Sequence, residues 1–245
     1  MPAMKIFGLH AAQAVLDYSP DRITRVWVDA QRRDQRLNGI LEALAAHRIH
    51  PETTDRKTLQ RLAAGQKHQG IVIEADMPQV LDERALKKAV SVLQETALFL
   101  VLDHVQDPHN LGACLRTADA TGVHGLIIPK DQAVGITPVV CKVASGAAES
   151  VPVYQVTNLA RTLRWLKEQD IWIFGAAGEA EQTLYQADMT VPLALVVGAE
   201  GKGMRRLVRE HCDLLVRLPM QGQVQSLNLS VAAGVLLYEV LRQRL

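Results

Sequence analysis

The sequence contains little cysteine, few aromatic residues and no long apolar run. Cys114, Cys141 and Cys212 form an odd set without paired spacing, so neither a disulfide framework nor a zinc site is expected. Such thiols suit a reducing cytoplasm. Aromatic residues make up 4% of the chain, which argues against a single-strand binder built on stacked aromatic rings. No cluster of metal-ligating side chains is evident, and we expect no metal site.

The apolar runs are short. ALFLVL (97–102) and PLALVVG (192–198) fall far below the roughly 18 residues that a membrane span needs. The stretch MPAMKIFGLHAAQAVL lacks the apolar core and cleavage site of a secretory signal. These features predict a cytoplasmic protein that makes no contact with membranes.

The formal net charge of +1 conceals an uneven distribution along the chain. Residues 1–75 hold 11 Lys and Arg against 8 Asp and Glu, a balance of +3. Basic residues gathered on one face are typical of a nucleic-acid interface, and a solvated surface is the plain alternative. The early arginines are Arg22, Arg25, Arg32, Arg33 and Arg36.

The first part of the chain alternates between helical and strand patterns and predicts a small α/β domain over residues 1–76. The charged stretch 77–95 has one helical segment and resembles a linker more than a core element. Within 1–76, helices are expected over 8–18, 36–49 and 54–65, and strands over 22–30 and 68–76.

Residues 96–245 predict a second, larger domain. Short, continuous apolar strands separated by helical segments indicate a parallel sheet covered on both faces. The expected strands are 97–103, 125–129, 171–176, 193–198 and 214–219.

Ligands of parallel α/β sheets bind beyond the carboxyl ends of the strands, so the loops that follow them are informative. The first, LDHVQDPHNLGACLRTADATG (102–122), leads into a small-residue helix that carries Arg116. In its plain interpretation Asn110 is a helix N-cap and Arg116 a surface residue. The second, VVGAEGKGMRRLV (196–208), is rich in glycine but matches neither a phosphate-binding P-loop nor a dinucleotide fingerprint.

The third stretch, PMQGQVQSLNLSVAAGVLLYEVLR (219–242), is a polar loop that runs into an apolar helix. Ser226 is a good candidate for the N-cap of this helix, but one cap does not account for Asn228 and Ser230 as well. Val231, Val235 and Tyr238 share one helical face. Gly234 inside the helix suggests close packing against another backbone.

Taken together, the three stretches resemble the SpoU (TrmH-like) ribose 2′-O-methyltransferases of the SPOUT superfamily. The stretches are DPHNLGACLRTADATGVHGLIIP, LALVVGAEGKGM and RLPMQGQVQSLNLSVAAGVLLYE, in the order and spacing of that family. FGLHAAQAVL, HQGI (68–71) and ASGAAESVPVYQVTNLARTL (144–163) extend the likeness to the members that methylate a guanosine ribose in 23S rRNA. His104 stands where relatives often have a small residue, and Gln225 where Ser is common.

The resemblance implies a parallel-sheet SPOUT domain with a C-terminal trefoil knot and a small N-terminal RNA-binding domain resembling ribosomal protein L30e. It implies methyl transfer from S-adenosylmethionine to the ribose 2′-OH of a 23S rRNA guanosine during ribosome biogenesis. It also implies a homodimer that associates through the catalytic domain and needs no metal.

The resemblance also assigns roles to single residues. Arg116 matches the catalytic arginine, and a guanidinium that stays protonated suits an electrostatic role better than that of a general base. The other acceptor-site residues would be Asn110, Glu200, Ser226 and Asn228. The implied cofactor-binding residues are Gly198, Leu218 and Leu227, with Gly201, Met220 and Gly222 nearby.

Other functions stay open at this point. Within the family, a tRNA ribose methyltransferase is the main alternative. A non-catalytic RNA-binding module is a second alternative, although Arg116, Glu200 and Asn228 are all present. A nucleotide-dependent dehydrogenase is a third, and the failed glycine fingerprint argues against it.

Overall fold

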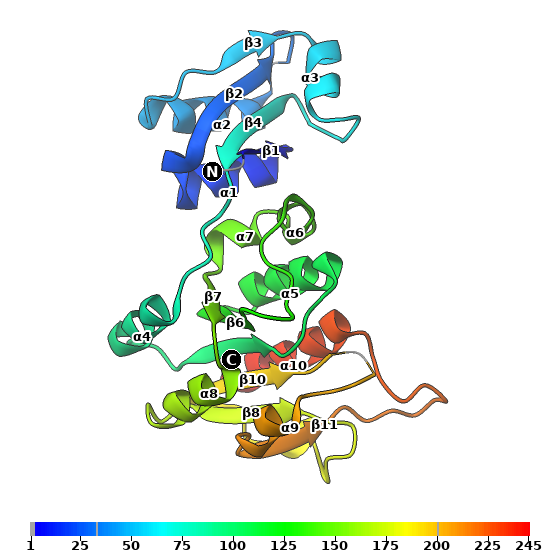
Figure 1. Ribbon diagram of the computed structural model, residues 1–245. Coiled ribbons are helices and arrows are strands. Elements are labelled where there is room, and N and C mark those ends of the chain that lie inside the picture. The colour runs from blue at the N-terminus through cyan, green and yellow to red at the C-terminus, as the bar shows by residue number, and fades with distance from the viewer. Residues whose placement is uncertain (1–2, 33, 200) are drawn as a thin grey trace. The chain divides into compact units, whose positions relative to one another are not determined.

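The computed structural model describes residues 3–32, 34–199 and 201–245. The chain divides into two compact units (Figure 1). Unit 1 comprises residues 1–78 and 136–150, and unit 2 comprises residues 79–135 and 151–245. None of the described helices is long and apolar enough to span a membrane.

Unit 1 is built on a four-stranded mixed sheet with the strand order β1-β4-β2-β3. β4 pairs antiparallel with β1 and β2, while β3 pairs parallel with β2. Its strands are β1 (Ala3–Phe7), β2 (Ile23–Asp29), β3 (Glu52–Thr54) and β4 (Ile71–Asp76), and its helices are α1 (Leu9–Tyr18), η1 (Pro20–Arg22), α2 (Gln35–Ala46), α3 (Arg56–Leu62), α6 (Pro138–Ala144) and α7 (Ala147–Ser150).

The helices of unit 1 follow from local sequence signals. Asp34 and Asp55 cap α2 and α3 by accepting hydrogen bonds from the amides of Leu37 and Thr58. The apolar positions of α1 and α2 recur at helical spacing and pack over the sheet, with Leu16 and Leu44 among the buried side chains. The sequence patterns missed β1 and the short β3, which become strands only because β4 and β2 pair with them.

Unit 2 is built on a seven-stranded sheet with the order β7-β6-β5-β10-β8-β11-β9 (Figure 1). Every pairing in this sheet is parallel, as the continuous apolar strands predict. The strands are β5 (Leu98–Leu102), β6 (Gly125–Pro129), β7 (Val153–Val156), β8 (Trp172–Ala176), β9 (Gln182–Thr183), β10 (Leu193–Val197) and β11 (Leu214–Arg217), and the helices are α4 (Glu83–Val92), α5 (Pro108–Ala120), α8 (Leu159–Lys167), η2 (Leu184–Gln186), α9 (Arg206–Glu210) and α10 (Leu229–Arg244).

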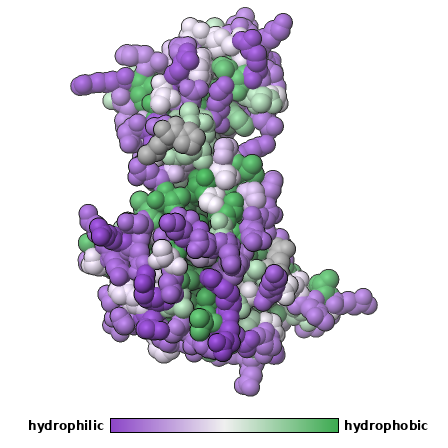
Figure 2. All heavy atoms as spheres, in the orientation of Figure 1, coloured by the Kyte–Doolittle hydropathy of each residue, from purple (hydrophilic) through white to green (hydrophobic). Residues whose placement is uncertain are grey.

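Most of the stretch 77–95 packs as part of unit 2. Leu86 on α4 is fully buried in a core cluster with Phe99 and Leu163. The amide of Leu81 donates to the carbonyl of Val153, at 2.8 Å. The linker-like composition reflects the outer face of α4, which is charged, while its inner face covers the sheet. On the face of unit 2 in view in Figure 2, hydrophilic residues predominate.

The helix α10 crosses unit 2 from one edge of the sheet to the other. Its buried side chains include Ala233, Leu236 and Val240, which face α5 and β10. Val231 and Tyr238, on the face singled out from the sequence, are instead 51% and 53% exposed. A Cβ added to Gly234 would make only an ordinary contact, 3.9 Å from Thr117 Cγ2, so no close backbone approach within the described chain requires this glycine.

The last turn of α10 is fastened to the amino edge of the sheet by Arg244. Its guanidinium donates to the carbonyls of Thr96 and Ala97 just before β5, at 3.0 and 3.1 Å. It also donates to the carbonyls of Met189 and Val191 before β10, at 3.2 and 2.6 Å. One side chain thus satisfies four backbone acceptors at the edge opposite the start of α10.

We expect the substitution Arg244→Met to lower the free energy of unfolding by about 1–3 kcal/mol, because carbonyls around the lost guanidinium are left without donors. Chemical denaturation followed by circular dichroism measures the change. The matched control is Arg206→Met, since Arg206 is 84% exposed and its one ion pair among the described residues is with Glu210, at 3.8 Å. That control is expected to change stability by less than about 0.5 kcal/mol. Equal stability of the two variants would contradict this role of Arg244.

Candidate active site at the carboxyl edge of the parallel sheet

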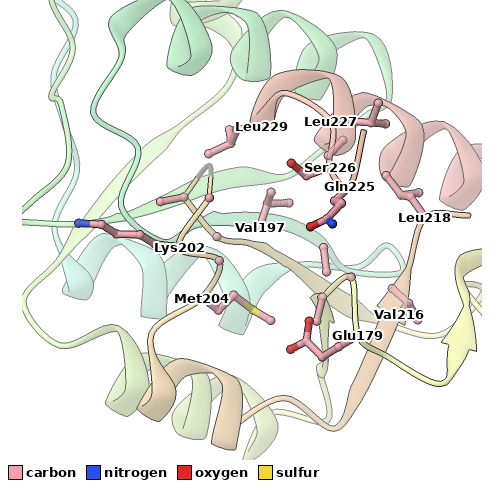
Figure 3. Close-up of a pocket in the computed structure, with 18 of the residues that line it drawn as sticks. Glu179, Val197, Lys202, Met204, Val216, Leu218, Gln225, Ser226, Leu227 and Leu229 are labelled. Carbon is pink, nitrogen blue, oxygen red and sulfur yellow. The ribbon is translucent and has the colours of Figure 1, made fainter. Parts of the chain in front are cut away.

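A cavity of about 680 Å³ opens at the carboxyl edge of the sheet of unit 2 (Figure 3). Loops that follow β8, β10 and β11 form its walls, together with the start of α10. A volume of this size is typical of small-molecule and cofactor sites. The lining residues are Ala176, Ala177, Gly178, Glu179, Val197, Gly198, Ala199, Gly201, Lys202, Gly203, Met204, Arg209, Val216, Leu218, Met220, Gln225, Ser226, Leu227, Leu229 and Ala232.

Five of the six residues expected to contact a cofactor line this cavity. They are Gly198, Gly201, Leu218, Met220 and Leu227. Gly222 is exposed and is not part of the wall. The loop 176–179, which the sequence reasoning missed, supplies another side of the cavity. Its signal was present, because Gly178 follows a buried apolar strand as Gly198 does.

The glycine loop after β10 needs its glycines for backbone reasons. A Cβ at Gly198 would lie 2.2 Å from the carbonyl carbon of Gly203 and 2.3 Å from the nitrogen of Met204. Ala199 and Gly203 exchange two backbone hydrogen bonds, at 3.1 and 2.8 Å, and close a tight turn. Within it, Gly201 and Gly203 have φ values of +73° and +65°, which favour glycine.

Asp103 anchors this loop to the neighbouring strand. The carboxylate follows β5 and is 0% exposed. It accepts hydrogen bonds from the backbone amide of Arg205, at 2.8 Å, and from the Arg205 guanidinium, at 2.7 Å. A buried carboxylate with both a guanidinium and an amide partner is well compensated for its loss of water. The ion pair therefore fixes where the glycine loop leaves the sheet.

His104 follows Asp103 in a left-handed conformation, with φ of +68°. A histidine in such a backbone needs compensating contacts. The imidazole provides two of them. Its Nδ1 lies 3.3 Å from the Asp103 carboxylate, and its Nε2 contacts the side-chain carbonyl of Gln132.

The first and third loops meet in a hydrogen bond between two asparagines. Asn228 Nδ2 donates to Asn110 Oδ1 at 3.0 Å, across 118 residues of chain. The two residues come from different elements, because Asn110 lies in the first turn of α5 and Asn228 directly precedes α10. The structure thus brings together two of the polar residues expected at the acceptor site.

Asn228, and not Ser226, is the N-cap of α10. Its Oδ1 accepts from the amides of Ser230 and Val231, at 3.0 and 3.4 Å, and from the Ser230 hydroxyl at 2.7 Å. Ser226 lies two residues earlier and lines the cavity. The cap of α5 also differs from expectation, because Asp107 accepts from the amide of His109 at 2.8 Å. Asp107 therefore holds the capping role that the plain interpretation gave to Asn110.

Arg116 lies six residues after Asn110 on α5 and is exposed. Among the described residues it forms no ion pair, so its charge is available to an anion. Glu200 lies outside the described residues. On the inner side of α5, burial raises the pKa of the Cys114 thiol to about 12, which rules out a thiolate nucleophile there at neutral pH. The described residues hold no group of three potential metal ligands.

Comparison with known proteins agrees with this geometry. The sequence matches the SpoU rRNA Methylase family over residues 97–238, and the RNA 2′-O ribose methyltransferase substrate-binding family over residues 5–81. The chain belongs to the SpoU rRNA methylase family. This confirms the membership predicted from the three loops.

The relatives match over almost their full length. The chain is 52% identical to the 23S rRNA (guanosine-2′-O-)-methyltransferase RlmB of Shewanella oneidensis, over 98% of this chain and 97% of that protein. It is 50% identical to RlmB of Escherichia coli, over 98% of each. The SpoU methyltransferase AviRb of Streptomyces viridochromogenes, solved in complex with the cofactor AdoMet, shares the fold, with a TM-score of 0.79, 23% identity and coverage of 99% and 90% of the two chains.

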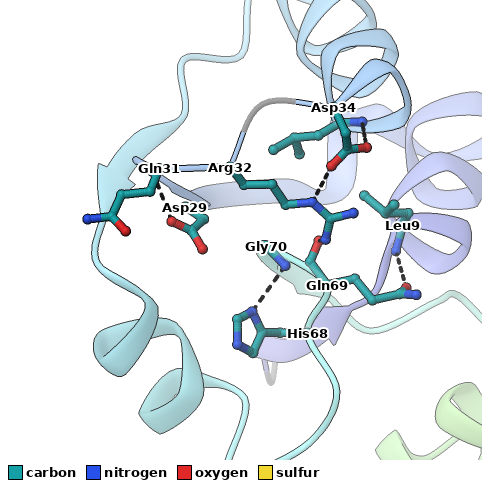
Figure 4. Close-up of polar contacts among 9 residues, drawn as sticks. Leu9, Asp29, Gln31, Arg32, Asp34, His68, Gln69 and Gly70 are labelled. Atoms are coloured by element: carbon teal, nitrogen blue, oxygen red, sulfur yellow. Dashed lines mark hydrogen bonds and ion pairs between the residues drawn. The ribbon is translucent and has the colours of Figure 1, made fainter.

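A second polar cluster surrounds the HQGI stretch of unit 1 (Figure 4). The Gln69 side chain accepts from the Leu9 amide at 3.0 Å and so caps α1, whose own N-cap residue is a glycine. His68 Nδ1 accepts from the Gly70 amide at 3.2 Å, and burial lowers the His68 pKa, which favours the neutral ring that accepts. Arg32 donates to the Gln69 carbonyl and to Asp34. The motif thus holds three segments of unit 1 together.

We expect Asn228→Ala to lower the free energy of unfolding by about 0.5–2 kcal/mol, because α10 loses its N-cap. Asn228→Asp retains the capping oxygen and is expected to keep the stability while losing only the donor to Asn110. Thermal denaturation compares the variants. Ser226→Ala is the control and is expected to unfold like the unaltered protein; a loss as large as that of Asn228→Ala would make Ser226 the cap instead.

A second pair of variants tests the glycine loop. Gly198→Ala is expected to lower the free energy of unfolding by about 1–3 kcal/mol, because the added methyl group would overlap the backbone at Gly203 and Met204. A Cβ at Gly222 meets no atom within 4 Å, so Gly222→Ala is expected to be neutral. Denaturant midpoints measure both, and a neutral Gly198→Ala would show that the loop can move aside.

Proposed function

We propose that this chain transfers a methyl group from S-adenosylmethionine to the ribose 2′-OH of a guanosine in 23S rRNA, during ribosome biogenesis. The observation that carries the proposal is the cavity at the carboxyl edge of the sheet, together with the Asn110–Asn228 hydrogen bond, which joins α5 to the start of α10 beside the cavity wall. Relatives that are about half identical over their full length bear that activity in their names.

The chemistry of the cavity fits the cofactor. Apolar side chains such as Val197, Leu218 and Leu227 offer surfaces for a flat purine. Backbone groups of the glycine loop come close enough to hydrogen-bond, because no side chains intervene. When bound, the cofactor supplies a methyl group on a sulfonium, which the ribose oxygen accepts as it loses its proton.

The protein's own residues orient the acceptor. Asn110 and Asn228, joined by their hydrogen bond, present polar groups for the ribose hydroxyl, with Ser226 on the adjoining wall. Arg116 stays protonated and binds the neighbouring phosphate or the developing alkoxide, which favours the charge that builds up during transfer. Glu200 would keep the shape of this site. Proximity and orientation of this kind account for about 7–11 kcal/mol of a barrier at best.

Residues 1–76 bind the RNA substrate in this proposal and residues 96–245 catalyse, while residues 77–95 connect the two and pack through α4 on the catalytic part. Some of the early arginines already have partners within unit 1, which leaves fewer of them to bind RNA. Arg22 is occupied by Glu149 and the Asp76 carbonyl, and Arg32 by the HQGI cluster. Arg25 stacks over Trp27, 4.6 Å from the ring centre, and pairs with Glu52, but stays about half exposed. Arg33 lies outside the described residues, whereas the exposed Arg36, Lys57 and Lys67 are available.

The proposal extends to features implied by the family. These are the L30e-like character of the first domain, the trefoil knot, a cytoplasmic location and a homodimer formed through the catalytic domain. The exposed apolar face of α10, with Val231 and Tyr238, supports the homodimer because such a face suits a self-complementary interface. A tRNA ribose methyltransferase and a non-catalytic RNA-binding module are the competing functions.

Tritiated methyl transfer decides between these functions. The protein is expected to label 23S rRNA that lacks its own modifications, with tRNA as the parallel acceptor. Labelling of tRNA alone would favour the tRNA enzyme, and no labelling of either would favour the binding module.

Arg116→Ala is expected to reduce labelling of 23S rRNA by about 100-fold or more, as losses of charge-stabilising groups commonly do. Binding of S-adenosylhomocysteine, followed by calorimetry, is expected to stay unchanged, since Arg116 is not part of the cavity wall. Full labelling by the variant would remove Arg116 from the mechanism.

A further inference from the structure

The cavity wall carries few polar side chains. Three of them, among the described lining residues, are charged: Glu179, Lys202 and Arg209. Glu179 and Arg209 form an ion pair with each other. The neutral polar groups are the Ser226 hydroxyl and the Gln225 amide.

The Gln225 side chain comes from the loop that precedes α10. Figure 3 shows its amide directed into the cavity, toward Val197, with Leu218 on its other side. It forms no hydrogen bond with a described side chain or backbone group. A planar carboxamide between apolar walls offers one donor and one acceptor side by side.

The apolar walls are the place for the flat, apolar part of the cofactor, which is the adenine ring. A ring seated there would take the Gln225 amide out of water, and an amide without partners in such a place costs about 1–3 kcal/mol. Adenine removes that penalty because its 6-amino donor stands next to a ring-nitrogen acceptor. Glutamine complements such an edge with two hydrogen bonds.

We propose that Gln225 reads the 6-amino edge of the cofactor's adenine and so sets the base specificity of the cavity. The inference rests on the proposed function, because it takes S-adenosylmethionine as the ligand. In this proposal the Gln225 side chain hydrogen-bonds the adenine in addition to the backbone groups of the glycine loop. A serine at this position would be too short to span the same distance, so the contact depends on the length of the Gln225 side chain.

The test is calorimetric binding of three probes to the full chain: S-adenosylhomocysteine, its analogue with hydrogen in place of the 6-amino group, and 5′-methylthioadenosine. Gln225→Leu and Gln225→Ser are each expected to lower the affinity for S-adenosylhomocysteine about tenfold. Affinity for the analogue without the amino group is expected to change less than about twofold. Methylthioadenosine keeps the adenine but lacks the amino-acid part. The affinity of the variants for it is expected to fall as much as their affinity for S-adenosylhomocysteine.

Gln223→Leu is the matched control, because Gln223 lies on the same loop, is exposed and is not part of the wall. It is expected to bind all three probes like the unaltered protein. Thermal denaturation of each variant verifies that the fold is intact.

Three outcomes would overturn the inference. These are unchanged affinities in the Gln225 variants, an equal loss for the probes with and without the amino group, and a loss for S-adenosylhomocysteine that methylthioadenosine does not share. The last would place Gln225 at the amino-acid end of the cofactor. Failure of the unaltered protein to bind S-adenosylhomocysteine would instead overturn the proposed function itself, so the two failures are distinct.

Discussion

The buried carboxylate of Asp103 is the contact on which the geometry of the site depends. It stands at the end of β5, directly before the loop that becomes α5, and it holds Arg205 at the end of the glycine loop. One charge pair therefore sets the spacing between the helix that carries Asn110 and Arg116 and the wall of the cavity. The Asp103 carboxylate is fully buried, and the Arg205 amide and guanidinium compensate it for the loss of water.

A parallel sheet makes this arrangement possible. All its strands end at one edge, so the loops after β8, β10 and β11, which are far apart in sequence, meet around one cavity. The helix α10 completes the site because Asn228 does two things at once. Its side-chain oxygen caps the helix, and its amide nitrogen binds Asn110. Capping fixes the rotamer of the side chain, and a fixed rotamer is what an orienting residue needs.

Much of the fold could be predicted from the sequence because the signals are local. Runs such as ALFLVL and GLIIP are apolar throughout, and the structure makes them the central strands β5 and β6, buried along their full length. The strands β1 and β3 escaped prediction because each is short and gains its hydrogen bonds from a neighbour distant in sequence. The helix of the stretch 77–95 was visible, but its burial depended on Leu86 meeting a core built from other segments.

The sequence by itself determined the alternation of strands and helices, the parallel character of the larger sheet, the three polar loops and the resemblance to the SpoU family. It did so because hydrophobic period and motif spacing are written in neighbouring residues. Only the tertiary structure decided that Asn228 rather than Ser226 caps α10, that Asp103 holds the glycine loop, and that Val231 and Tyr238 face outward. Each of these features depends on contacts between segments that are distant in sequence. No local sequence pattern encodes which of those segments come close enough to pack or to form hydrogen bonds.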